Sequence, residues 1–106
     1  MHIIILGTLG AHSMPDHPGR TWHRDKRVML EDLLAAPEIG GQLRGLWWTA
    51  GIHDLVIHAE VRDLVAAHAL SLTLSRKLKA HCVMLTALVE ADMDDVLDFL
   101  EIRDGP

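Results

Sequence analysis

The chain has 106 residues, which is enough for one domain built around a single hydrophobic core. Hydrophobic residues make up 49% and charged residues 24% of the chain, a balance typical of folded globular proteins and unlike that of disordered or fibrous ones. The net charge is −5, and the ten lysines and arginines are scattered apart from the short segment RDKR at residues 24–27. This argues against a nucleic-acid partner, because phosphate binding needs clustered cations. We therefore expect one domain over residues 1–100 and a polar tail over residues 101–106.

The cysteine content and the length of the apolar segments indicate the cellular compartment of the protein. A single cysteine, Cys82, excludes an intrachain disulfide and fits a reducing compartment. The apolar run Ile3–Leu6 is too short for the core of a signal peptide, and no segment approaches the roughly 18 apolar residues of a membrane span. We expect a cytoplasmic protein with no membrane partner.

The first half of the chain predicts a strand, a long loop and a helix. Residues 2–9, HIIILGTL, are rich in β-branched residues and are typical of a strand at the centre of a sheet. Residues 10–20 are dense in Gly, Pro, Ser and Asp and predict a loop, and long loops in compact domains are often binding loops. Apolar residues recur at helical spacing from about Thr21 to Ala36, where Pro37 ends the pattern.

The second half of the chain predicts a hairpin, a helix, a strand and a final helix. Residues 43–50 and 52–61 have strand patterns and are joined at Gly51, which suits a hairpin. Asp63 is a suitable N-cap for a helix over residues 64–78. The remaining elements are a strand over residues 81–89 and a short helix over residues 92–100, capped by Asp92.

This order of elements predicts an α+β fold of the ferredoxin-like type, βαββαβ with a C-terminal helix, in which two helices cover one face of a four-stranded antiparallel sheet. In the third strand Leu55, Ile57 and Ala59 suit the helix side, so Asp54, Val56, His58 and Glu60 are left on the other face. Both alternating sets of the last strand are largely apolar, so we expect the second face to pack in a homodimer, with higher assembly left open.

A family resemblance follows from the segment RGLWWTAGIHDLVIHAEV, residues 44–61. It resembles the signature of GYD-domain proteins, in which an aromatic-rich strand leads through W-T-x-G-x-Y-D into an aliphatic strand. Trp48, Thr49, Gly51 and Asp54 match, whereas His53 replaces the tyrosine. Residues 66–88 are similar to that family's second helix and following strand, so the resemblance covers about half of the chain. It implies a dimeric α+β barrel with the two sheets face to face, and it implies no particular reaction.

Candidate catalytic residues lie in the third strand. His58, on the face without helices, would line the space between the two sheets of a dimer. There it is either a general base or ligand contact, or a histidine satisfied by a cross-strand partner. Asp54 is either its partner in proton transfer or a structural carboxylate that accepts backbone N–H groups near the hairpin.

Candidate ligand contacts are Trp48, His53 and Val56. Adjacent tryptophans on a strand point to opposite faces, so one of Trp47 and Trp48 belongs to the core and the other faces the dimer cavity, where an indole can stack on a planar ligand. His53 stands where the resemblance has a tyrosine, and is expected to keep its packing and hydrogen-bonding role.

A second group of candidates lies around the predicted loop. Imidazole and carboxylate side chains at this density suit a transition metal ion as cofactor. Their spacing matches no established metal motif, so the alternative is a solvated loop with incidental histidines. The residues are His12, Asp16, His17 and His23.

Two functions are weighed on this basis. The first is a dimeric α+β barrel that handles a small cyclic or aromatic metabolite, as an enzyme with proton-transfer or metal-assisted chemistry. The second is a non-catalytic small-molecule or metal-binding sensor or accessory protein. A structural dimer with a filled interior is the third outcome. An open cavity in which His58 and a second polar group converge would favour an enzyme.

Overall fold

The computed structural model of the chain describes residues 1–10 and 19–104. Within this range the order of elements is the expected one. The elements are β1 (His2–Leu9), α1 (Trp22–Ala35), β2 (Gln42–Trp48), β3 (Leu55–Glu60), α2 (Leu64–Leu78), β4 (Ala80–Ala87) and α3 (Glu90–Asp104).

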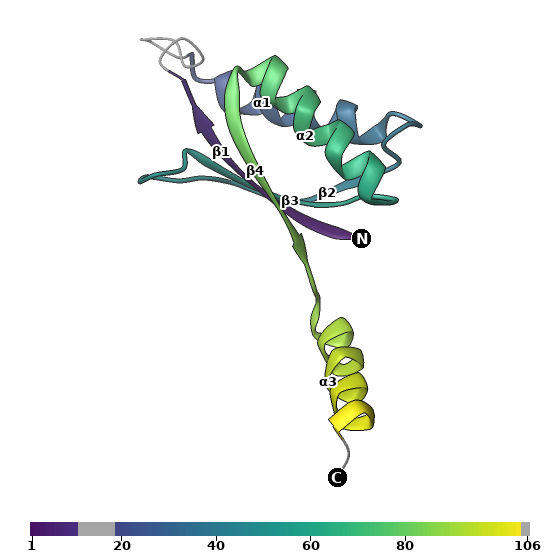
Figure 1. Cartoon of the computed structure of the whole chain (residues 1–106). Helices are drawn as coiled ribbons and strands as arrows, with labels where there is room; N and C mark the ends of the chain where they lie inside the picture. The colour runs from purple at the N-terminus through teal and green to yellow at the C-terminus, as the bar shows by residue number, and fades with distance from the viewer. Residues whose placement is uncertain (11–18, 105–106) are drawn as a thin grey trace.

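The four strands form one antiparallel sheet in the order β2-β3-β1-β4. Figure 1 shows α1 and α2 together on one side of this sheet, while the other side carries no helix across it. The expectation of an α+β fold with a four-stranded antiparallel sheet is confirmed, and the arrangement is compatible with a ferredoxin-like protomer. The sheet therefore has a face covered by helices, called here the covered face, and an open face.

The hydrophobic core lies between the covered face and the two helices. Strand β3 alternates between buried and half-buried residues, as the sequence predicts, with Leu55, Ile57 and Ala59 buried. On β4 the partly buried Cys82 and Met84 pack against the core, which places Val83 and Leu85 on the open face. The largest fully buried side chains are Ile3, Ile5, Leu34, Ile57, Leu70 and Leu74.

Helix α2 has the bounds that the sequence predicts, because its termini carry strong local signals. The Asp63 carboxylate accepts a hydrogen bond of 2.8 Å from the Ala66 backbone N–H, which confirms the predicted N-cap. At the other end Lys79 adopts the left-handed conformation, with φ of 50°, and β4 begins at the next residue. This one-residue connection couples α2 closely to β4.

The β2–β3 hairpin contains an irregularity that decides which side chains reach which face. The register shifts between Leu43 and Gly45, so Arg44 is an extra residue in β2, as in a β-bulge. The turn itself spans residues 49–54 and is closed by a hydrogen bond of 2.8 Å from the Thr49 N–H to the Asp54 carbonyl. Gly51 has φ of 133° there, a conformation that glycine adopts readily.

Helix α3 differs from the predicted short helix at both ends. It begins at Glu90, so the prediction that Asp92 is its N-cap was wrong. Asp92 lies in the first turn, and its carboxylate accepts a hydrogen bond of 3.1 Å from the Val89 N–H, the backbone half of a capping box. The helix continues to Asp104, four residues into the segment expected to be a polar tail.

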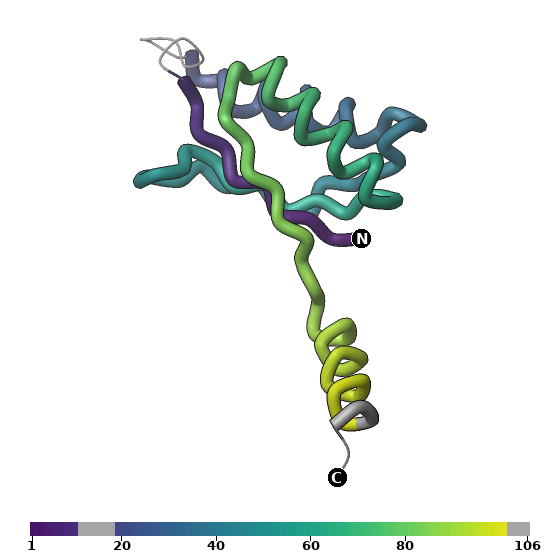
Figure 2. Tube along the Cα trace, viewed as in Figure 1, coloured from purple at the N-terminus to yellow at the C-terminus, as the bar shows by residue number. Residues whose placement is uncertain are grey.

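Helix α3 also projects away from the sheet and the other helices (Figure 2). The chain measures 60 × 33 × 20 Å along its principal axes, with a radius of gyration of 16.4 Å. A compact chain of this length has a radius of gyration of about 13 Å. None of the described helices is both long and apolar enough to cross a membrane.

Candidate functional site

The open face of the sheet presents apolar side chains from all four strands. The cross-strand pairs place Leu6 opposite Val56 and Val83, and Val56 is in turn opposite Trp47. Several of these side chains are strongly exposed, with Trp47 at 53% and Leu85 at 49%. The large apolar residues of this face are Ile4, Leu6, Trp47, Val56, Val83 and Leu85.

His58 lies on this face and has a cross-strand partner. Its Nε2 atom is 3.1 Å from Nδ1 of His2, and the two ring centroids are 5.3 Å apart. His58 is opposite Ile4 and His2 is opposite Glu60, so the imidazoles meet diagonally across β1 and β3. One ring donates and the other accepts, which fixes complementary tautomers in the neutral pair.

His2 was not among the residues expected at the site, because the register between the first and third strands cannot be read from the sequence. The only available signal was that a ferredoxin-like order places these two strands side by side. The observed register brings the first residue of β1 next to the fourth residue of β3.

The Trp47 side chain lies beside the histidine pair. Its indole lies over Gly45, so closely that a Cβ atom at Gly45 would collide with the ring. Gly45 is the cross-strand neighbour of His58, so the Trp47 ring covers the position next to that imidazole. An indole and an imidazole pair are thus adjacent on the open face.

Trp48 lies on the covered face instead. It pairs with the buried Leu55, and its ring centroid is 5.1 Å from that of Trp22 on α1. Of the expected ligand contacts, Val56 shares the face of His58, whereas Trp48 does not. The β-bulge at Arg44 explains the difference, since one extra residue exchanges the faces of all residues that follow it in β2.

Asp54 has a structural position at the far end of β3. Its carboxylate accepts a hydrogen bond of 2.7 Å from the Leu9 N–H, and its own N–H donates to the Gly7 carbonyl at 2.8 Å. It is four residues from His58 along an extended strand, a separation of about 13 Å. The two residues expected to share a proton transfer are therefore not brought together within one chain.

His53 also contributes to the hairpin end of the sheet. Its Nδ1 atom is 3.3 Å from the Thr8 hydroxyl, and its carbonyl accepts a hydrogen bond of 2.6 Å from the Thr49 hydroxyl. These contacts join the turn to β1. They are separate from the His2–His58 pair.

A charged pair borders the open face next to His2. The guanidinium of Arg44 contacts the Glu60 carboxylate, with Nη2 2.6 Å and Nε 3.0 Å from Oε2. This hydrogen bond, together with the charge of Arg44, holds the pKa of Glu60 below its ordinary value. Glu60 is opposite His2, so a carboxylate stands beside the imidazole pair.

The predicted metal ligands give no metal site in the part of the chain that the structure describes. His12, Asp16 and His17 lie outside the described residues. His23 is an exposed residue in the first turn of α1. Among the residues described, no group of three or more His, Cys, Asp or Glu side chains is arranged to hold a metal ion.

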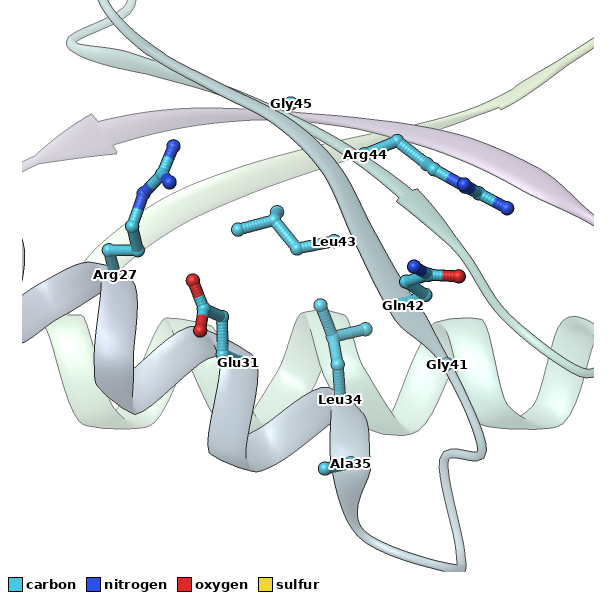
Figure 3. Close-up of a pocket in the computed structure, with 9 residues that line it drawn as sticks. All are labelled: Arg27, Glu31, Leu34, Ala35, Gly41, Gln42, Leu43, Arg44 and Gly45. Carbon is cyan, nitrogen blue, oxygen red and sulfur yellow. The ribbon is translucent and has the colours of Figure 1, made fainter.

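Among the hollows at the margins of the sheet, two differ in their position relative to the histidine pair. A groove of about 400 Å³ separates α1 from β2 (Figure 3), where Arg27 and Glu31 face Leu43. It contains neither histidine of the pair. A shallower depression of about 450 Å³ lies where β4 meets α3, and it does include His2 and Glu60. Its other lining residues are Met1, Thr86, Ala87, Leu88, Val89, Asp92 and Asp95.

Comparison of the chain with protein families, with curated proteins and with solved structures finds no match. The resemblance to GYD-domain proteins therefore stays a prediction from the sequence.

Proposed function

We propose that two copies of this chain associate through the open face of the sheet and that the space between them holds a small cyclic or aromatic molecule. The observation that carries this proposal is the composition of the open face, where a half-buried imidazole pair and an indole lie among exposed apolar side chains. Ligand sites are typically apolar surfaces with a few polar groups placed among them.

His58 is the residue that contacts the ligand or transfers a proton in this proposal. Its Nε2 atom is hydrogen-bonded to Nδ1 of His2, so a proton can pass between the two imidazoles and on to a bound molecule. Trp47 supplies a flat aromatic surface next to His58, which suits a planar ring in the ligand. These contacts support proton transfer as the chemistry, with the His2–His58 pair in place of a His58–Asp54 pair.

Binding without chemistry is the second candidate function, a small-molecule sensor or accessory protein. The position of Asp54 favours it, because this carboxylate is engaged by the Leu9 N–H at the far end of β3 and does not orient His58. Metal-assisted chemistry would depend on His12, Asp16, His17 and His23, and no step is assigned to them.

Ligand binding is tested by titrating the full chain with a panel of small aromatic and cyclic acids, alcohols and ketones. Binding is followed by tryptophan fluorescence and by the shift in melting temperature. We expect at least one compound to bind, and His58→Ala to weaken its binding tenfold or more. His68→Ala is the matched control, because His68 is an exposed histidine on α2.

Turnover of the bound compound decides between the two functions. Loss of turnover in both His58→Ala and His2→Ala, with binding retained in His2→Ala, supports an enzyme. Binding with no turnover of any compound supports the sensor. Equal binding by wild type, His58→Ala and His68→Ala would remove the open face from consideration as the site.

A further inference from the structure

Helix α3 carries an apolar stripe that no other described element covers. Met93, Val96, Leu97 and Leu100 are three or four residues apart and so share one side of the helix. All four are exposed, Leu97 by 52%. No other described helix or strand packs along α3 (Figure 1). An isolated helix of 15 residues is marginal in water, so its stability calls for a packing partner.

The exposed area of the chain is large enough to account for an extensive interface. The chain exposes 7309 Å², whereas a compact monomer of 11.8 kDa exposes about 5,900 Å². The excess of about 1,400 Å² exceeds the roughly 800 Å² that each partner buries in a stable interface of standard size. The excess exposed area is thus large enough for one side of a stable dimer interface.

The apolar surface of α3 continues that of the open face. Val83 and Leu85 of β4 lie on the open face, and the strand leads through the exposed Leu88 and Val89 into the stripe of α3. In Figure 1 the helices α1 and α2 lie above the sheet and α3 extends below it, on the side of the open face. A molecule that docks on the open face therefore meets α3 as well.

The connection between β4 and α3 argues against α3 folding back on its own sheet. Only Leu88 and Val89 separate the two elements. The hydrogen bond from the Val89 N–H to the Asp92 carboxylate holds Val89 against the first turn of the helix, which leaves Leu88 as the residue where the chain could turn. A single residue gives little room for α3 to reverse its direction and lie along its own sheet.

We infer that α3 is an exchanged arm, whose apolar stripe packs against a second copy of this chain on the open side of the partner's sheet. This inference rests on the association of two copies proposed above, and it adds the segment that holds them together. Each protomer then covers the end of the cavity of the other, so the site is incomplete in a single chain.

The first test is the mass of the full chain in solution, measured by sedimentation velocity for wild type, Leu97→Asp and Ala91→Asp. Ala91 is exposed on the side of α3 opposite the stripe, so both variants add one negative charge to the same helix. We expect wild type and Ala91→Asp to be dimers, and Leu97→Asp to associate at least tenfold more weakly. Circular dichroism checks that Leu97→Asp keeps its sheet. A monomeric wild type, or equal association of the two variants, overturns the inference.

The second test establishes which copy α3 contacts. A spin label is attached to the cysteine of an Asp94→Cys, Cys82→Ser double variant. This chain is mixed with ¹⁵N-labelled chain that carries no spin label. We expect broadening of the amide signals of Leu6 and Val83 in the ¹⁵N chain. Absence of broadening in the ¹⁵N chain, while sedimentation shows that the two chains associate, overturns the exchange. Ligand titration tests the proposed function separately. If α3 is exchanged between the two copies but no compound binds, the proposed ligand binding is wrong and the exchange of α3 still holds.

Discussion

The two faces of the sheet have similar apolar content and opposite surroundings. On the covered face Ile3, Ile5 and Ile57 are essentially inaccessible to solvent, because α1 and α2 pack over them. On the open face Trp47 and Leu85 are about half exposed. Apolar side chains on both faces mean that the helices of one chain cover only one face of the sheet, and the apolar side chains of the other face stay exposed in the single chain.

The largest expected effect comes from a change on the covered face. Leu70→Ala removes a side chain with 0% exposure from the core, and we expect it to lower the free energy of unfolding by about 2–5 kcal/mol. Urea denaturation measures this difference. Leu72→Ala, on the exposed side of the same helix, should change the free energy of unfolding by no more than about 0.5 kcal/mol.

A charge on the open face should act on association rather than on folding. Leu85→Asp places a carboxylate in the proposed interface, so we expect the mass in solution to halve while the circular dichroism spectrum is retained. Light scattering measures the mass. Val65→Asp makes the same change of charge at a residue that is 77% exposed on α2, and it should leave the mass unaltered. A Leu85→Asp chain that fails to fold would show that this face is part of the core.

Asp54 allows a test at the end of the sheet where the hairpin meets β1. Asp54→Asn weakens the charge-assisted hydrogen bond from the Leu9 N–H, and we expect a loss of about 1 kcal/mol in the free energy of unfolding. Chemical denaturation measures this loss, and fluorescence titration measures ligand binding. A loss of turnover without a loss of stability would return Asp54 to a catalytic role.

The smallest effects concern two exposed carboxylates whose pKa values are lowered in the folded chain. The hydrogen bond and charge of Arg44 lower the pKa of Glu60, and the hydrogen bond from the Ala66 backbone N–H lowers the pKa of Asp63. Each carboxylate therefore stabilises the fold above its ordinary pKa, 4.5 for Glu60 and 3.8 for Asp63, and loses this contribution as the pH falls through the lowered value.

Denaturation of wild type, Glu60→Gln and Asp63→Asn at pH 6 and at acid pH measures this contribution. Both variants should be less stable than wild type at pH 6, and the difference should shrink in acid. A difference that grows in acid would contradict the lowered pKa values.

The sequence predicts those elements whose signals are local. The β-branched run of β1 and the Asp63 cap of α2 gave the observed bounds, since each depends on neighbouring residues alone. The start of α3 was missed because Asp92 suits both an N-cap and the first turn of a helix.

The candidate site was predicted less well because it depends on pairing between strands. His58 was placed on the correct face by alternation, but its partner His2 required the register of β1 against β3. Trp48 was assigned to the cavity, whereas the register shift at Arg44 turns Trp47 to the open face. A bulge has no reliable signature in a single sequence, so neither contact could be derived without the structure.

The bulge at Arg44 has a consequence for how such a protein can change through evolution. Deletion of the single codon for Arg44 would return β2 to a regular register, in which Leu43 is still opposite Ala59 and Gly45 is still opposite His58, so Trp47 and Trp48 would keep their faces. The open face would then lose only the guanidinium that pairs with Glu60. The bulge is thus a position at which β2 can gain or lose one residue while the other side chains that line the site keep their places and β1, β3 and β4 keep their pairing.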